Sequence, residues 1–148
     1  MQKDIYSEDR EETRRRFSHF ALRTRHAERC AEFYSEVFDL HLINNKADDP
    51  NFYLSDGRMT LAVLQWNMDD YYGMDPQRLG PDHIGFKVES IESLKDDLED
   101  LTGQNPLMRS RPLGYGDEGK ARLGLFQSVP LNTYHLTDIE GVYIGASE

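Results

Sequence analysis

The sequence has little of three things that would each point to a class of protein: cysteine, basic charge and long apolar runs. Cys30 is the single cysteine among 148 residues, so no disulfide can form within the chain, and we expect a reducing cytoplasm as its location. The 17 Lys and Arg residues against 27 Asp and Glu give a net charge of −10. That balance disfavours a nucleic-acid surface, because phosphate contacts need clustered cations. No stretch approaches the roughly 18 apolar residues of a membrane span, so we expect neither nucleic acid nor membrane as a partner.

The length suits one domain, or two small units that share a core. Residues 1–16 are charged throughout and lack the apolar segment of a secretory signal, and we interpret them as an N-terminal arm.

The first half of the chain shows one strand pattern, one helix pattern and three further strand patterns. Residues 17–24 alternate with the period of a strand, and residues 26–39 carry apolar side chains at helical spacing. Three short strand-like runs follow, separated by turn residues, at 40–44, 52–54 and 59–66. The predicted order over residues 17–66 is therefore strand, helix, strand, strand, strand.

The same order begins again after residues 67–81, which lack periodicity and are predicted to be a linker. A strand is predicted at 82–88, then a helix with Ser90 as its N-cap that ends at Thr102–Gly103. The glycine-rich stretch 111–122 is predicted to be a mobile loop, and strands are predicted at 123–129, 133–137 and 142–146. This second unit spans residues 82–148.

The two units are related by a weak internal repeat at an offset of 83 − 19 = 64 residues. The offset aligns His19 with His83 and Ala21 with Gly85, so each opening strand carries a histidine at its second position. The repeat predicts two copies of one β-α-β-β-β unit.

Three segments resemble the vicinal oxygen chelate superfamily, which includes glyoxalases, bleomycin-resistance proteins and extradiol dioxygenases. FSHFALRTRHAERCAEFYSEVFDL is similar to the opening of the first module of that family, GPDHIGFKVESIESL to the opening of the second, and HLTDIEGVYIGASE to the closing hairpin. The resemblance covers residues 17–147. It implies an α+β fold in which two β-α-β-β-β modules form a curled mixed sheet around a cavity, with the helices outside. It also implies a homodimer.

The resemblance further implies metal ligands on the opening and closing strands of each module. His19 and His83 match the two opening-strand positions. The closing-strand positions fall near Leu61 or Ala62 and at Gly145, none of which can bind a metal, so the carboxylate ligands are absent. Two histidines alone hold a divalent ion such as Fe, Mn, Ni, Co or Zn weakly, because catalytic sites usually have three protein ligands.

Four further residues are candidates for the same cavity. His135 lies across the closing hairpin from Gly145 and is a candidate catalytic acid or base, or a third ligand. Tyr53, Trp66 and Phe126 are candidates for substrate binding, although ordinary packing explains Tyr53 equally well and explains Trp66 and Phe126 better.

Two functions follow from this set of residues. The first is a small-molecule enzyme that acts on a substrate with vicinal oxygens through a divalent metal, as a lyase, isomerase or ring-cleaving dioxygenase. The alternative is a metal-free binding protein that sequesters a small molecule, as bleomycin-resistance proteins do. The matched histidines favour the enzyme, and the missing carboxylates favour the binding protein. A structural module is a weaker third reading.

Overall fold

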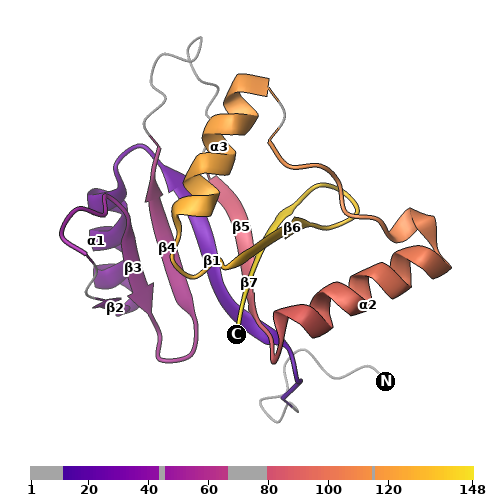
Figure 1. Cartoon of the computed structure of the whole chain (residues 1–148). Coiled ribbons are helices and arrows are strands. Elements are labelled where there is room, and N and C mark those ends of the chain that lie inside the picture. The colour runs from indigo at the N-terminus through magenta and orange to yellow at the C-terminus, as the bar shows by residue number, and fades with distance from the viewer. Residues whose placement is uncertain (1–11, 44–45, 67–79, 115) are drawn as a thin grey trace.

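The computed structural model describes residues 12–43, 46–66, 80–114 and 116–148 (Figure 1). The elements in chain order are β1 (Arg16–Thr24), α1 (Ala27–Phe38), β2 (His41–Ile43), β3 (Phe52–Ser55), β4 (Thr60–Gln65), β5 (Gly80–Lys87), α2 (Ile91–Gln104), the short 3-10 helix η2 (Pro106–Met108), α3 (Gly116–Ser128), β6 (Tyr134–Thr137) and β7 (Tyr143–Ser147). The strands form one open mixed sheet in the order β2-β3-β4-β1-β5-β7-β6. The predicted α+β class with a mixed sheet is confirmed. Within the described residues, no helix is long and apolar enough to cross a membrane.

The predicted arm and linker fall mostly outside the described residues. Residues 1–11 of the arm and 67–79 of the linker belong to that part of the chain. At the edges of both segments the strand boundaries differ from the prediction, because β1 already begins at Arg16 and β5 already begins at Gly80.

The central strands carry a twofold relationship that reflects the internal repeat. β1 runs antiparallel to β5, and Phe20 pairs with Ile84, a difference of 84 − 20 = 64 residues that equals the repeat offset. On either side of this pair, β1 is parallel to β4 and β5 is parallel to β7. The register also makes Tyr53 and His135 equivalent, because they pair with Ala62 and Gly145 in the two halves.

Helices α1 and α3 cover opposite faces of the first half of the sheet. Ala27 and Ala31 of α1 pack on Leu54 and Val63 of the sheet, as the amphipathic pattern predicts. On the other face, Val129, which directly follows α3, joins Ala21, Tyr53, Ala62 and Leu64 in a second buried cluster. The face that would line a cavity in a curled sheet is therefore covered by the end of α3 (Figure 1).

The predicted strand at 123–129 is wrong, because residues up to Ser128 belong to α3. The predicted loop at 111–122 is wrong in its second half for the same reason. Leu123, Phe126 and Val129 lie three residues apart, a helical spacing that a short apolar run can also display in a strand. The three glycines of α3 lower its intrinsic helix propensity and made a loop and strand the expected structure.

The second half of the chain therefore has one strand fewer than the first. Its order is strand, helix, 3-10 helix, helix, strand, strand. The predicted Ser90 cap is confirmed, since the Ser90 side chain accepts a hydrogen bond from the Ser93 N–H. The predicted end of that helix at Thr102–Gly103 comes slightly too early, because α2 continues through Gly103 to Gln104.

Candidate functional site

Two buried histidines from the central strands form the core of the candidate site. His19 of β1 pairs with Gly85, and His83 of β5 pairs with Ala21. Their side chains are 0% and 3% exposed, and their Nε2 atoms lie 3.1 Å apart with the rings nearly perpendicular. Gly85 makes this possible, because a Cβ added there would lie 1.9 Å from the His19 ring.

A buried carboxylate orients His83. The Oδ2 atom of Asp82 lies 2.6 Å from His83 Nδ1, so the carboxylate accepts the Nδ1 proton. Asp82 itself is 2% exposed, and its Oδ1 lies 3.1 Å from Arg23 Nε and 3.3 Å from Arg122 Nε. Two guanidinium groups therefore compensate a charge that would be costly to bury alone. The remaining nitrogen of His83, Nε2, is left to face His19.

His19 is held in its neutral form. Burial lowers its pKa most, the electrostatic interaction with His83 lowers it as well, and a hydrogen bond with the Asn132 side chain acts in the opposite direction, so that the pKa is about 4. Its Nδ1 atom lies 2.9 Å from the Ser18 hydroxyl, which can donate or accept there. A neutral imidazole is the form that accepts a proton or binds a metal ion.

Asn132 completes the arrangement, and nothing in the sequence analysis pointed to it. It lies in the turn between α3 and β6 and is 6% exposed. Its Nδ2 atom donates to the Phe126 carbonyl at 3.0 Å and also lies 3.0 Å from His83 Nε2. Its Oδ1 atom is buried and has no hydrogen bond of ordinary geometry among the described residues, although the Asn132 side chain interacts with His19 and raises the pKa of that imidazole.

Gly145 explains why Asn132 fits at this position. A Cβ on Gly145 would lie 1.7 Å from Asn132 Oδ1, so the amide occupies the space that a side chain at 145 would enter. The sequence shows that position 145 has no side chain. It does not show which residue from elsewhere in the chain occupies the space.

The structure brings His19 and His83 together and does not bring His135 to them. His135 on β6 packs edge-to-face on Phe126, with ring centroids 4.8 Å apart, and Phe126 also contacts the His83 ring, with centroids 4.6 Å apart. The His135 Nε2 atom is buried and has no hydrogen-bond partner among the described residues, and burial, followed by the electrostatic interaction with His83, lowers the pKa of this group. Within the described part of the chain, no group of three His, Cys, Asp or Glu side chains could hold a metal.

The predicted substrate-binding residues are buried in the packed interior. Tyr53 is 6% exposed and donates its hydroxyl to Asp49 at 3.1 Å. Trp66 is 3% exposed, and the Arg23 guanidinium lies 5.7 Å from its ring centroid. Phe126 is fully buried and lies on α3 rather than on a strand.

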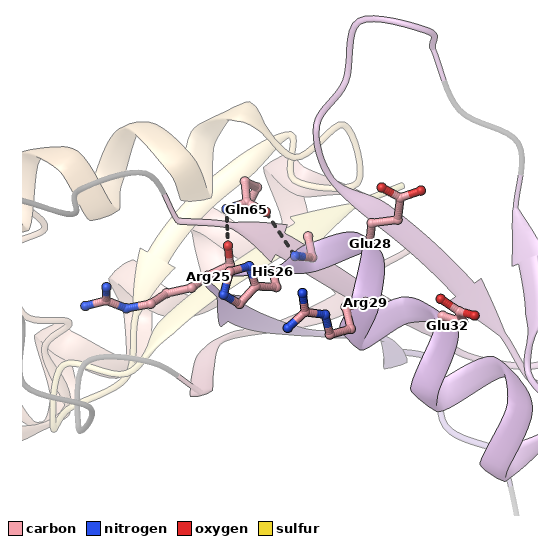
Figure 2. Close-up of a pocket in the computed structure, with 7 residues that line it drawn as sticks. Arg25, His26, Glu28, Arg29, Glu32 and Gln65 are labelled. Atoms are coloured by element: carbon pink, nitrogen blue, oxygen red, sulfur yellow. Dashed lines mark hydrogen bonds between the residues drawn. The ribbon is translucent and has the colours of Figure 1, made fainter.

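A surface pocket of the described residues lies elsewhere, at the start of α1, and has a volume of about 390 Å³ (Figure 2). Its lining residues are Arg25, His26, Ala27, Glu28, Arg29, Glu32 and Gln65. The Gln65 side chain bridges the strand and the helix, because its Oε1 accepts from the Ala27 N–H at 2.9 Å and its Nε2 donates to the Arg25 carbonyl at 2.6 Å. The bond from the Ala27 N–H to Gln65 Oε1 caps the start of α1, where the His26 side chain makes no capping hydrogen bond. The pocket contains neither His19 nor His83.

Comparisons with known proteins give a family and a fold. The model of the Glyoxalase/Bleomycin resistance protein/Dioxygenase superfamily matches residues 16–128. A solved hypothetical protein from Bacillus halodurans C-125 is 14% identical with a TM-score of 0.52, covering 92% of this chain and 96% of that one. A methylmalonyl-CoA epimerase is 14% identical with a TM-score of 0.51, covering 88% and 92%.

The methylmalonyl-CoA epimerase from Mycobacterium tuberculosis is 11% identical with a TM-score of 0.51, covering 88% of this chain and 85% of that one. Identities this low show a shared fold and carry no statement about the reaction. No curated protein matches the chain.

Proposed function

This chain belongs to the glyoxalase/bleomycin resistance/dioxygenase superfamily, and on that premise we propose that it is a small-molecule enzyme that holds a divalent metal ion between His19 and His83. Its substrate would carry two neighbouring oxygen atoms. A divalent ion at this position would supply Lewis-acid polarisation of those oxygens.

The observation that carries the proposal is the 3.1 Å separation of the two Nε2 atoms. Two nitrogens that each bind one zinc-sized ion at about 2.0–2.1 Å can be at most about 4.2 Å apart, so the pair meets this condition. Both histidines are buried on paired central strands, which fixes their separation without an ion.

The surroundings of His83 also fit a metal ligand. Metal-binding histidines usually donate their other ring N–H to a carboxylate or carbonyl, which fixes the tautomer and the ring orientation. Asp82 provides this contact at Nδ1, so the lone pair of Nε2 points into the site. His19 needs no deprotonation at neutral pH, because burial lowers its pKa to about 4.

His135 stays our candidate for the acid or base of this enzyme. Its Nε2 atom has no hydrogen-bond partner among the residues that the structure describes, which leaves it available to a substrate. Phe126 contacts both His83 and His135, so a substrate that bridges the two histidines must displace this ring. The proposal therefore requires α3 to move during the reaction cycle.

One observation favours the alternative, a metal-free binding protein. Among the described residues no third His, Cys, Asp or Glu joins the two histidines, and Gly145 stands where a carboxylate would be expected. If the chain is a metal-free binding protein, an aromatic or apolar compound would bind to Tyr53, Trp66 and Phe126 once α3 moves aside.

Metal analysis separates the two functions. Protein purified without chelator or histidine tag is assayed by plasma mass spectrometry beside a His19→Ala/His83→Ala double variant. The control is a His26→Ala/His41→Ala variant, which removes two exposed histidines. We expect near-stoichiometric Fe, Mn, Ni, Co or Zn in the wild type and the control, and loss of the metal in the site variant. A wild type that stays metal-free after reconstitution would refute the metal enzyme and leave the binding protein.

A further inference from the structure

The side of the sheet that carries α1 has an exposed apolar centre on β1, β5 and β7. It consists of Phe17, Phe20, Leu22, Ile84, Phe86 and Ile144, which together form what is here called the central face. We infer that a second copy of this chain packs on the central face and forms a twofold homodimer. The inference does not depend on the proposed function, because His19 and His83 point to the opposite side of the sheet, where they are buried.

The register of the sheet shows that these side chains share one side. Phe20 pairs with Leu61 on one neighbouring strand and with Ile84 on the other, and Leu61 packs against the cluster under α1. Directly paired residues point to the same side of a sheet, so Phe20 and Ile84 both lie on the α1 side. Ile84 pairs in turn with Ile144 on β7. A continuous apolar row therefore crosses the middle of the sheet.

The two sides of β1 are reversed relative to a strand that has one side in water. On the α3 side, His19, Ala21 and Arg23 are 0%, 1% and 7% exposed. On the α1 side, Phe17 and Phe20 are 56% and 42% exposed, with ring centroids 6.0 Å apart. Antiparallel sheets that face water on one side carry polar residues there. The alternation in β1 places large apolar side chains at those positions instead, which indicates that another surface covers them.

The helices of the described chain leave the central face open. α1 packs on β3 and β4, where it contacts Leu54 and Val63. α2 has no buried residue and lies beside the edge strand β6, where Lys95 Nζ is 5.1 Å from the ring centroid of Tyr134. The end of α3 packs on the opposite side of the sheet, through Val129. The surface that covers the central face must therefore come from outside the described chain.

The size of the exposed apolar surface suits a dimer. The two half-exposed phenylalanines and the four partly exposed side chains of the central face leave roughly 350 Å² of apolar area per copy. Phe33 and Val37 on α1 are 56% and 57% exposed, and they bring the area to roughly 550 Å² if α1 takes part in the contact. A standard interface buries about 800 Å² per partner, of which about 65%, or roughly 520 Å², is apolar in homodimers. The available apolar area is therefore close to what a stable dimer needs.

The charges around the central face also suit a copy of the same chain. Arg16 and Lys87 pair at one end of it and are exposed, whereas Asp82, the one carboxylate in β1 and β5, is buried. α2 is acidic, with one lysine against Glu92, Asp96, Asp97, Glu99 and Asp100. A second copy therefore brings both a matching apolar face and carboxylates for the exposed cations at its rim. Such pairs reduce the repulsion between two chains that each carry a net charge of −10.

The experiment is sedimentation equilibrium of the full chain from low micromolar to millimolar concentration. Phe17→Thr/Phe20→Thr removes both exposed rings and retains high strand propensity. Phe17→Thr alone changes the more exposed position and serves if the double variant does not fold. Leu107→Thr is the matched control, because Leu107 lies on η2 and is 84% exposed. Circular dichroism checks the fold of each variant.

We expect the wild type and Leu107→Thr to sediment as dimers. Phe17→Thr/Phe20→Thr should raise the dissociation constant of the dimer by roughly a hundredfold or more, and Phe17→Thr alone by roughly tenfold. Lys87→Glu should raise it as well, most of all at low ionic strength. A wild type that is monomeric at every concentration would overturn the inference and leave the central face to a different partner. A dimer that survives unchanged in both phenylalanine variants would overturn it too, because the interface would then lie elsewhere. Neither result bears on the metal content of His19 and His83, so the proposed function is tested separately.

Discussion

The Nε2 atoms of His19 and His83 lie 3.1 Å apart, although 64 residues separate the two histidines along the chain. The twofold relationship of the sheet explains this. Phe20 and Ile84 pair at the axis between the antiparallel strands β1 and β5, and each histidine lies one residue before its axis residue. Equivalent side chains next to a local twofold axis must meet. A repeat that places one histidine in each opening strand therefore produces a pair.

Gly85 should tolerate no side chain, because a Cβ there would lie 1.9 Å from the His19 ring. We expect Gly85→Ala to lower the free energy of unfolding by about 1–3 kcal/mol, since overpacking forces the ring out of place. The control is Gly103→Ala on α2, where nothing lies within 4 Å of the added atom. That change should stabilise the protein by up to about 1 kcal/mol. Urea unfolding measures both, and a Gly85→Ala protein as stable as the wild type would show that the ring is not confined.

Asp82→Asn should lower the free energy of unfolding by more than the removal of a surface charge does. The carboxylate is 2% exposed and contacts His83, Arg23 and Arg122, so the change removes a buried negative charge beside two guanidinium groups. Breaking a buried ion pair from one side typically costs about 3–5 kcal/mol, and we expect the lower end because Arg122 is partly exposed. The affinity for a divalent ion should also fall roughly 10- to 100-fold, as for other partners of ligating histidines.

Asp97→Asn is the matched control for this change. Asp97 pairs with Arg14 and Arg15 on the surface, and its side chain is 49% exposed. An exposed pair of this kind contributes less than about 1 kcal/mol. Equal urea midpoints for the two variants would mean that the Asp82 network does not hold the site together.

The pH dependence of stability should carry a signature of His19 in the metal-free protein. Its pKa is about 4 in the folded protein against 6.5 for an ordinary histidine, so the unfolded chain takes up the proton first as the pH falls. The free energy of unfolding is therefore unaffected above about pH 6.5, decreases as the pH falls below that value, and levels off below about pH 4. The difference of 6.5 − 4 corresponds to about 3 kcal/mol at most.

A His19→Gln variant isolates this contribution from that of the carboxylates, because it lacks the titrating group and changes little else. Its unfolding free energy should fall less between pH 7 and pH 5 than that of the wild type. Imidazole chemical shifts followed by NMR give the His19 titration directly. A midpoint near 6.5 would contradict the assignment of a desolvated, neutral His19.

The sequence predicted the first half of the fold well because each element there has a pattern of its own. Residues 17–24 and 26–39 change cleanly from a period of two to a helical period, and the structure places β1 and α1 there. At 123–129 the apolar residues fit both periods, and the glycines at 116, 119 and 124 weaken the helical reading. Packing of Phe126 and Val129 on the sheet decides in favour of α3, and this packing cannot be read from local sequence.

The internal repeat predicted the part of the candidate site that the two repeat units share, and no more. His19 and His83 occupy equivalent positions, so the offset alone brought them together. His135 shares a face with Gly145, but the Phe126 ring on a helix that was not foreseen contacts both His83 and His135. Asn132 follows no motif. Its role depends on a three-dimensional contact with Gly145 and the histidines, which the spacing of residues does not contain.

A carboxylate at position 145, where the family pattern has one, should fit into the fold only if the Asn132 side chain is removed as well. Gly145→Glu alone places a Cβ 1.7 Å from Asn132 Oδ1, so we expect a loss of about 1–3 kcal/mol in the free energy of unfolding. With Asn132→Ala the space opens, and the double variant should be at least about 1 kcal/mol more stable than the sum of the two single changes. It should also bind Co²⁺ more tightly than Asn132→Ala, because a carboxylate then joins the histidines.

Gly124→Glu is the control for that cycle, since nothing lies within 4 Å of a Cβ at this exposed position of α3. Its combination with Asn132→Ala should be additive within about 0.5 kcal/mol, as expected for sites without shared partners. Additivity of Gly145→Glu with Asn132→Ala as well would mean that the amide does not occupy the place of the missing side chain. The glycine at 145 would then be an ordinary strand residue with no steric relationship to Asn132.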